Sequence, residues 1–179
     1  MKLLANNCEI KRGSKIKNTE LPVSRLFASN IILNLFLNRK HKNMPAPYTG
    51  GCQCGNIRYT LKNEPLRLYA CHCTACQQQS GSAFGMSMVV DKESFEIKGS
   101  LKSFNRTADS GGEVTSFFCP ECGNRIYGTS PYNPDGVTIK PGTLDDTSWL
   151  TPSRMLWMNS AQKWVPVPDS METEEFQGS

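Results

Sequence analysis

The sequence predicts a single mainly β domain that is organised around two metal sites. Fourteen glycines and eleven prolines among 179 residues indicate many turns, and the hydrophobic fraction of 38% is low for a globular chain. From residue 44 onward, short runs alternate between apolar and polar residues, and long helical periodicity is absent. Seven of the eight cysteines fall in three tight groups. A small domain with so many loops is often stabilised by metal as well as by its core.

The first half of the domain is expected to consist of short strands. The range Ile57–Leu61 alternates apolar with polar residues, which is the period of a half-buried strand. Before it, Pro45 and Pro47 mark an extended lead-in, and Gly50-Gly51 permits a tight loop. A short helical turn is expected at Gln77–Gly81. Further strands are expected at Leu66–Ala70, Phe84–Val90, Phe95–Lys98 and Leu101–Asn105.

The second half continues the pattern of strands and turns. Val114–Phe118 is expected to run as a strand into Cys119-Pro120-Glu121-Cys122-Gly123, a turn whose backbone N–H groups can point at thiolate sulfur. The acidic tail from Asp169 is expected to fray. Two more strands are expected at Arg125–Thr129 and Val137–Lys140. Three tryptophans near the end are expected to cover the sheet: Trp149, Trp157 and Trp164.

Residues 1–43 are predicted to be a basic leader outside the domain, which then spans residues 44–179. Nine basic residues against two acidic ones give the leader a net charge of +7. Its apolar stretch Leu26–Leu37 is followed by Arg39-Lys40-His41-Lys42, a composition that also occurs in organelle-targeting peptides. We favour a disordered or weakly helical leader, or a start codon assigned upstream of a true first residue at Met44. Cys8 has no nearby thiol and is left out of the metal count.

The charge of the domain argues against nucleic acid as a partner. The whole chain carries +4, so residues 44–179 carry −3, whereas nucleic-acid binding needs a basic face on the folded part. No apolar run approaches the roughly 18–20 residues that span a bilayer, so no membrane association is expected. No secretory signal is recognisable, so we expect a reducing compartment, the cytoplasm, unless the leader targets an organelle. The sequence does not predict an oligomeric state.

The cysteines have the spacing of metal ligands. Cys71-His72-Cys73-Thr74-Ala75-Cys76 places three thiols within six residues, between the pairs Cys52/Cys54 and Cys119/Cys122. Without a secretory signal, such spacing is more typical of metal ligands than of disulfides. Seven sulfurs divide into a set of four, which closes a structural zinc site, and a set of three, which leaves one coordination position open. Spacing does not assign the sets, because Cys73/Cys76 with Cys119/Cys122 would make an equally good site.

Four segments occur in an order that is typical of a known family: Gly51-Cys52-Gln53-Cys54-Gly55, Cys71-His72-Cys73-x-x-Cys76 followed by Ser80-Gly81, Phe117-Phe118-Cys119-Pro120-x-Cys122-Gly123, and Pro141-Gly142-Thr143-Leu144-Asp145. Over residues 46–176 the chain resembles the glutathione-dependent formaldehyde-activating enzyme family, which includes the centromere protein V group. The resemblance implies an Mss4-like fold of small antiparallel sheets with two zinc ions. It also implies a carbon–sulfur lyase that reversibly joins glutathione and formaldehyde into S-hydroxymethylglutathione.

The resemblance also divides the cysteines between the two ions. It implies that a catalytic ion is held by Cys71, Cys73 and Cys76, and that a structural ion is held by Cys52, Cys54, Cys119 and Cys122. A metal-bound thiol is deprotonated because coordination favours the thiolate. We therefore expect glutathione or a related small thiol to be the partner at the open position. The leader matches nothing in the family.

Other suggestive residues have simpler interpretations. His72 lies between two cysteines, but we expect its ring to pack or hydrogen-bond rather than to relay protons. We expect Gln77–Gln79 to form a solvated turn. Arg125 and Lys140 are candidates for holding carboxylates of the substrate, although single cations on strands are usually surface charges.

Two alternative functions remain open. One is a related zinc enzyme that uses the same open site for another thiol or another small electrophile. The other is a zinc-stabilised binding module without catalysis. A binding module is expected to close both ions with four ligands or to keep only one ion, so the group of three cysteines favours an enzyme.

Overall fold

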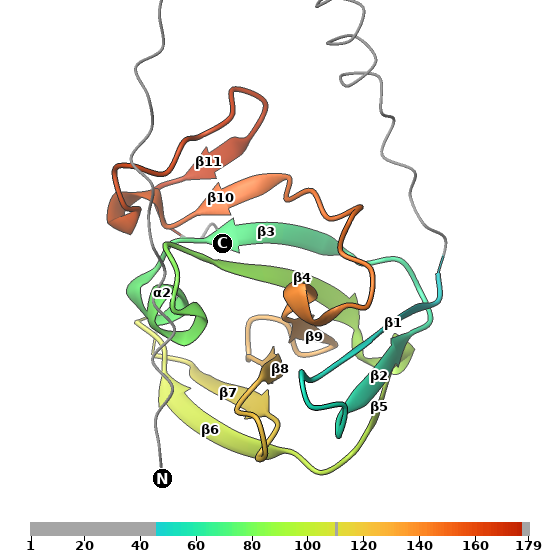
Figure 1. Cartoon of the computed structure of the whole chain (residues 1–179). Helices are drawn as coiled ribbons and strands as arrows, with labels where there is room; N and C mark the ends of the chain where they lie inside the picture. Colours follow the sequence, from blue (N-terminus) through green and yellow to red (C-terminus); the bar gives the residue numbers. More distant parts are fainter. Residues whose placement is uncertain (1–45, 110, 177–179) are drawn as a thin grey trace, which may run out of the picture. The chain divides into compact units, whose positions relative to one another are not determined.

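The computed structural model describes residues 46–109 and 111–176, which form two β-sheets (Figure 1). The predicted mainly β fold is confirmed. The smaller sheet is antiparallel, in the order β1-β2-β5. Its strands are β1 (Tyr48–Gly51), β2 (Arg58–Leu61) and β5 (Phe95–Lys98). The predicted leader, with Cys8 and the proposed start at Met44, lies outside the described residues, so the domain boundary stays a prediction.

The larger sheet has eight strands in the order β11-β10-β3-β4-β9-β8-β7-β6. All its neighbouring strands are antiparallel except β10, which runs parallel to both β3 and β11. It is therefore a large mixed sheet, where small antiparallel sheets were expected. Its strands are β3 (Arg67–Cys71), β4 (Gly85–Asp91), β6 (Lys102–Thr107), β7 (Glu113–Phe118), β8 (Arg125–Thr129), β9 (Gly136–Ile139), β10 (Arg154–Leu156) and β11 (Glu172–Glu174).

One short α-helix, α2 (Thr74–Ser80), packs against β4 at the end of the larger sheet where β3 finishes (Figure 1). It begins three residues before the predicted turn because Cys73 serves as its N-cap. It ends, as predicted, at Gly81, whose left-handed φ of 60° favours glycine. Three 3₁₀ turns span Lys92–Ser94, Pro141–Thr143 and Met158–Ser160. Within the described ranges, no helix has both the length and the apolar character needed to cross a membrane.

Eight strands were predicted to within two residues, and three were missed. The missed strand β1 includes Gly50 and Gly51, where a tight loop was expected. β11 lies in the acidic tail that was expected to fray, so this expectation was wrong for Glu172–Glu174. Arg154 on β10 donates hydrogen bonds of 3.0 Å to carboxylates of both Glu172 and Glu174, so the acidic residues hold the strand in place.

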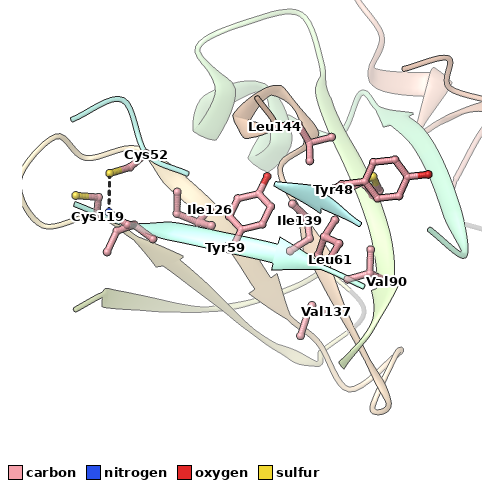
Figure 2. Packing of buried hydrophobic residues seen from close by; sticks show 12 residues of the cluster. Tyr48, Cys52, Tyr59, Leu61, Val90, Cys119, Ile126, Val137, Ile139 and Leu144 are labelled. Carbon is pink, nitrogen blue, oxygen red and sulfur yellow. Dashed lines mark hydrogen bonds between the residues drawn. The ribbon is translucent and has the colours of Figure 1, made fainter. Parts of the chain in front are cut away.

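The core lies between the two sheets (Figure 2). Its fully buried members include Leu61 from the smaller sheet and Val90 and Ile139 from the larger one. Of the tryptophans, Trp149 packs on this core by stacking against Tyr48, with ring centroids 4.8 Å apart. Trp157 is half-buried. Trp164 is 72% exposed, so its predicted covering role was wrong; its indole N–H donates to the Gln162 side chain near the surface.

The segment Pro141–Asp145 joins the two sheets. Thr143 Oγ1 donates to the Lys140 carbonyl (2.7 Å) and also hydrogen-bonds the Tyr59 hydroxyl (2.9 Å). Leu144 forms an isolated β-bridge with Gly50, and Asp145 pairs with Arg58. Because Pro141, Gly142 and Thr143 also line the pocket described below, these contacts fix one of its walls.

Candidate metal centres

Four thiols meet at one end of the core. Cys52 and Cys54 lie in the turn between β1 and β2, while Cys119 and Cys122 lie in the turn between β7 and β8. Figure 2 shows Cys52 and Cys119 beyond the apolar side chains. The four sulfurs lie within 4.8 Å of one another, and none is in a disulfide. The Cys52–Cys54 and Cys54–Cys119 separations of 3.4 and 3.6 Å are close to the roughly 3.8 Å edge of a tetrahedron with Zn–S bonds of about 2.3 Å.

The backbone turn at Cys52 favours the thiolate form of that residue. Glycines with positive φ, Gly55 at 83° and Gly123 at 71°, close the two turns. The Ile57 N–H donates to Cys52 Sγ at 3.1 Å. Burial alone would raise the pKa of Cys52, but this N–H and the three neighbouring thiols lower it to about 6. The donor set and its geometry therefore fit a zinc ion.

The second cluster joins Cys71, Cys73 and Cys76, whose sulfurs also lie within 4.8 Å of one another. Cys71 ends β3 and is buried, whereas Cys73 and Cys76 are half-buried. The first turn of α2 brings the last two together, because the Cys76 N–H donates to Cys73 Sγ at 3.4 Å. Within residues 46–109 and 111–176, no fourth cysteine, histidine or carboxylate joins this group.

The three thiols influence one another strongly. Hydrogen bonds from Cys71 and Cys73 lower the pKa of Cys76 to about 2, and the charges of Lys140 and Arg125 act in the same direction. The same thiol contacts, with burial, raise the pKa of Cys71. Three crowded thiols therefore release their protons together only beside a cation, which is the environment that a bound Zn²⁺ provides.

A C-terminal segment holds the backbone between these cysteines. The His72 N–H donates to the Leu156 carbonyl at 2.9 Å. Gln77 Nε2 donates to the carbonyls of His72 (2.6 Å) and Ser160 (2.9 Å), and Ser160 Oγ donates to the His72 carbonyl at 3.0 Å. Trp157 turns the chain here in a left-handed conformation with a φ of 61°, which is rare for a bulky residue.

The structure differs from the sequence expectation at Gln77 and agrees with it at His72. Gln77 was expected to belong to a solvated turn, but it is half-buried and hydrogen-bonded to two carbonyls; only Gln78 and Gln79 are exposed. The His72 ring packs as expected. It is fully buried, with its centroid 5.3 Å from that of Phe84. The sequence pattern did not indicate that Gln77 and Ser160 support the cluster. Their hydrogen bonds go to backbone carbonyls, and two of these bonds join residues more than 80 positions apart.

A pocket of about 550 Å³ lies between the two clusters. Cys76 of the group of three and Cys122 of the group of four both line it. Gln53 and Phe84 contribute to its walls, and Arg125 and Lys140 supply its cations. A pocket of this volume is typical of small-molecule sites.

The two cations are not ordinary surface charges. Lys140 Nζ donates to Ser87 Oγ at 3.2 Å and to the Met86 carbonyl at 3.4 Å. Burial lowers the pKa of Lys140 to about 8, and the charge of Arg125 acts in the same direction. Nε and Nη1 of Arg125 are buried and have no hydrogen-bond partner among the described residues.

Comparison with known proteins shows which protein family the chain resembles. A sequence model of the glutathione-dependent formaldehyde-activating enzyme family matches residues 47–160, which include all seven clustered cysteines. The chain belongs to this family. The match supports the resemblance that the cysteine segments indicated. The grouping of the sulfurs follows the division that the family implies, and Cys73/Cys76 with Cys119/Cys122 is not the grouping found.

Individual family relatives are distant. Two fungal proteins that bear the family's name are similar to parts of the chain. The Sordaria macrospora protein is 29% identical over 97 residues, which cover 50% of this chain and 40% of the relative. The Penicillium rubens protein is 24% identical over 86 residues, which cover 45% and 44%. The aligned region thus spans less than half of either relative. A crystal structure of a Rhodobacter sphaeroides protein is 17% identical, with a TM-score of 0.46, and covers 56% of this chain and 90% of its own.

Proposed function

We propose that this domain is a zinc-dependent carbon–sulfur lyase that reversibly joins glutathione and formaldehyde, in the manner of S-(hydroxymethyl)glutathione synthase. One observation carries the proposal. A group of three thiols borders a pocket of small-molecule size, and no fourth protein ligand completes the group within the described ranges. Membership in a family named for glutathione-dependent activation of formaldehyde supports the choice of substrates.

The proposal gives the two cysteine clusters different roles, with two zinc ions per chain. Cys52, Cys54, Cys119 and Cys122 would close a structural site, since four thiolates complete a tetrahedron. Cys71, Cys73 and Cys76 would hold the catalytic ion and leave one position for a ligand. Bound there, zinc would keep an incoming thiol deprotonated near neutral pH.

The reaction itself is an addition. The sulfur of glutathione forms a bond to the carbon of formaldehyde, and the carbonyl π pair moves to oxygen. The proton that the thiol released returns to that oxygen, so that thiol and aldehyde together give the hydroxymethyl thioether. The reverse reaction breaks the same carbon–sulfur bond. Neither direction needs an oxidant or a reductant.

The chain's own residues contribute position and environment. The first turn of α2 fixes two of the sulfurs, and the Gln77 and Ser160 contacts hold the backbone at His72. The pocket wall at Pro141–Thr143 is fixed through the smaller sheet. Holding two reactants in one orientation lowers the entropic part of the barrier. A reducing compartment such as the cytoplasm would keep the seven thiols free.

The decisive experiment combines metal analysis with NMR exchange spectroscopy. The purified chain is expected to contain two zinc ions. It is also expected to accelerate the interconversion of the free reactants, formaldehyde and glutathione, with their product, S-hydroxymethylglutathione. Cys73→Ser is expected to retain one zinc and the fold but to lose the acceleration. Full activity in a Cys73→Ser protein with one zinc would reject the assignment of the catalytic cluster.

The same measurement separates the alternatives. Two bound zinc ions with acceleration only for a different thiol would indicate a related enzyme with another substrate. Two bound zinc ions without acceleration for any thiol would indicate a binding module. Both results would contradict the proposed reaction while leaving the metal sites in place.

A further inference from the structure

We propose that Arg125 and Lys140 form a carboxylate receptor beside Cys76, so that the substrate is a thiol that carries a carboxylate and binds through it. The reaction of that thiol rests on the proposed function, whereas the binding of its carboxylate does not. The proposal thus assigns two specificity-determining residues to the pocket between the cysteine clusters.

The fold places the two cations side by side. Arg125 begins β8 and Lys140 directly follows β9, its antiparallel neighbour. The Lys140 N–H donates to the Ile126 carbonyl at 2.8 Å, so the two backbones are joined next to Arg125. Both side chains line the pocket that Cys76 also lines. A ligand there can reach the thiol cluster and both cations.

These cations lack the acidic partners that three other cations of the described residues have. Arg58, Lys62 and Arg154 each form an ion pair with a carboxylate. Among the described residues, no ion pair involves Arg125 or Lys140, and two guanidinium nitrogens of Arg125 are buried without any partner. Burying a guanidinium without hydrogen-bond partners, beside a second cation that has no acidic partner, is costly, so this arrangement favours an incoming anion.

The sheet leaves room for the guanidinium. A Cβ atom at Gly128 would lie 3.2 Å from Arg125 Nη2 and 2.9 Å from the Thr115 carbonyl oxygen. The absence of a side chain at Gly128 therefore lets Arg125 lie close against β8. Lys140 is held in turn by Ser87 and the Met86 carbonyl. Donors that are fixed before the ligand arrives lose little entropy when it binds.

The thiolates alone do not account for these charges. Three thiolates with one Zn²⁺ carry a formal charge of −1, whereas Arg125 and Lys140 together carry +2. Arg106 adds further positive charge nearby, since its charge, together with the larger effect of burial, lowers the pKa of Arg125. A substrate thiolate on the zinc would bring the cluster to −2, whereas the three cations together carry +3, so one positive charge is left for a ligand carboxylate. Guanidinium and carboxylate groups form strong charge-assisted hydrogen bonds.

A ligand without a free thiol tests the receptor separately from the chemistry. S-methylglutathione keeps both carboxylates but cannot form a thiolate. Isothermal titration of the zinc-loaded full chain is expected to detect its binding, and the diester of the same compound is expected to bind at least about tenfold more weakly. Equal binding of the acid and the diester would overturn the proposal.

Variants then assign the effect to the two cations. Arg125→Gln and Lys140→Gln are each expected to weaken S-methylglutathione binding by about tenfold or more. Arg125→Lys should recover part of this loss because it keeps the charge, and it remains informative if Arg125→Gln folds poorly. Lys102→Gln removes an exposed charge from β6, away from the pocket, and should bind like the wild type. If Arg125→Gln and Lys140→Gln lose zinc but bind S-methylglutathione as tightly as the wild type, the two cations only stabilise the thiolates. This result would overturn the carboxylate receptor.

The exchange reaction distinguishes this proposal from the lyase proposal. Glutathione is expected to react faster than neutral 2-mercaptoethanol, with the preference reduced in Arg125→Gln. Equal acceleration of both thiols would overturn the receptor and leave the lyase standing. Binding of S-methylglutathione through the two cations, without acceleration for any thiol, would overturn the lyase and support the receptor.

Discussion

At the scale of single residues, Tyr59 shows how a polar group inside the core makes stability depend on pH. Its ring is 3% exposed, and its hydroxyl reaches Thr143 Oγ1 at 2.9 Å. Burial raises the pKa of Tyr59 to about 12, against an ordinary value near 10. The unfolded chain therefore loses this proton above pH 10 while the folded chain keeps it. Stability from this group is complete below pH 10 and is lost as the pH rises toward 12.

Tyr59→Phe tests this linkage. At pH 8 the variant should be about 1 kcal/mol less stable, because one hydrogen bond is lost. At pH 11 the unfolding free energy of the wild type should have fallen by about 1.4 kcal/mol through this tyrosine, a loss that the variant does not have. The stability difference between the two proteins should therefore vanish or reverse. Urea unfolding of both zinc-loaded proteins at the two pH values measures this. A constant difference from pH 8 to 11 would show that the tyrosine titrates normally.

Gly50 is a residue whose missing side chain matters. An added Cβ would lie 2.5 Å from the Thr143 carbonyl oxygen and would also meet the Tyr59 ring. Gly50→Ala should therefore push β1 away from the Pro141–Thr143 turn and the Tyr59 ring, and cost about 2 kcal/mol of unfolding free energy. Gly142→Ala is the control. It meets nothing within 4 Å and should change stability by less than about 0.5 kcal/mol. Similar denaturation midpoints for both variants would contradict the close approach.

At the scale of elements, the sequence predicted strands wherever apolar and polar residues alternate. β5 and β8 have the predicted bounds because turn residues delimit them on both sides. β10 and β11 have only three residues each, too few for a period to show, and β11 carries charges that normally indicate a loose tail. Their pairing depends on Arg154 contacts with residues 18 and 20 positions away, which local patterns do not reveal.

The helix α2 depends on a side chain that the local pattern did not single out. Gln77→Glu keeps the shape of the side chain but removes both hydrogen-bond donors and directs a carboxylate at the carbonyls of His72 and Ser160. If the proposed ions are bound, zinc should leave the cluster of three thiols faster, while release from the cluster of four is unchanged. Zinc transfer to a coloured chelator should show two kinetic phases, one for each cluster. In the variant, only the phase from the cluster of three thiols should be faster.

Gln78→Glu is the matched control for this helix. It makes the same charge change one position along α2 on an exposed residue, so the release kinetics should match the wild type. Equal acceleration in both variants would mean that negative charge near the cluster, rather than the lost hydrogen bonds, controls zinc release. Acceleration in neither would show that the Gln77 contacts do not hold the cluster.

At the scale of the whole molecule, the candidate site was only partly predictable. The three cysteines of Cys71–Cys76 are close in sequence, but spacing left open a site made of Cys73/Cys76 with Cys119/Cys122, and the family resemblance was needed to group them. The four-sulfur cluster joins Cys54 and Cys119 across 65 positions, and only the family resemblance indicated it. The pocket cations Arg125 and Lys140 were named as candidates, but each looked like an isolated strand charge. Their burial and proximity come from the pairing of β8 with β9 and were visible only in the fold.

The different places of the two clusters in the fold predict that metal is lost in two steps. The cluster of four thiols joins the β1–β2 turn to the β7–β8 turn, and a structural zinc can contribute on the order of 10 kcal/mol to folding. The cluster of three links only the end of β3 to α2, which the C-terminal segment also holds. Chelator titration should therefore remove one ion per chain with the β-sheet circular dichroism intact and should unfold the chain only as the second ion leaves.

Matched cysteine variants assign these two steps. Cys73→Ser should show only the later step, starting from a folded chain with one zinc. Cys54→Ser makes the same substitution in the other cluster and should unfold the chain before any chelator is added, because three remaining thiolates no longer close the long loop. Simultaneous loss of both ions with the circular dichroism signal would contradict the two-step loss. A folded Cys54→Ser protein beside an unfolded Cys73→Ser protein would reverse the roles of the two clusters.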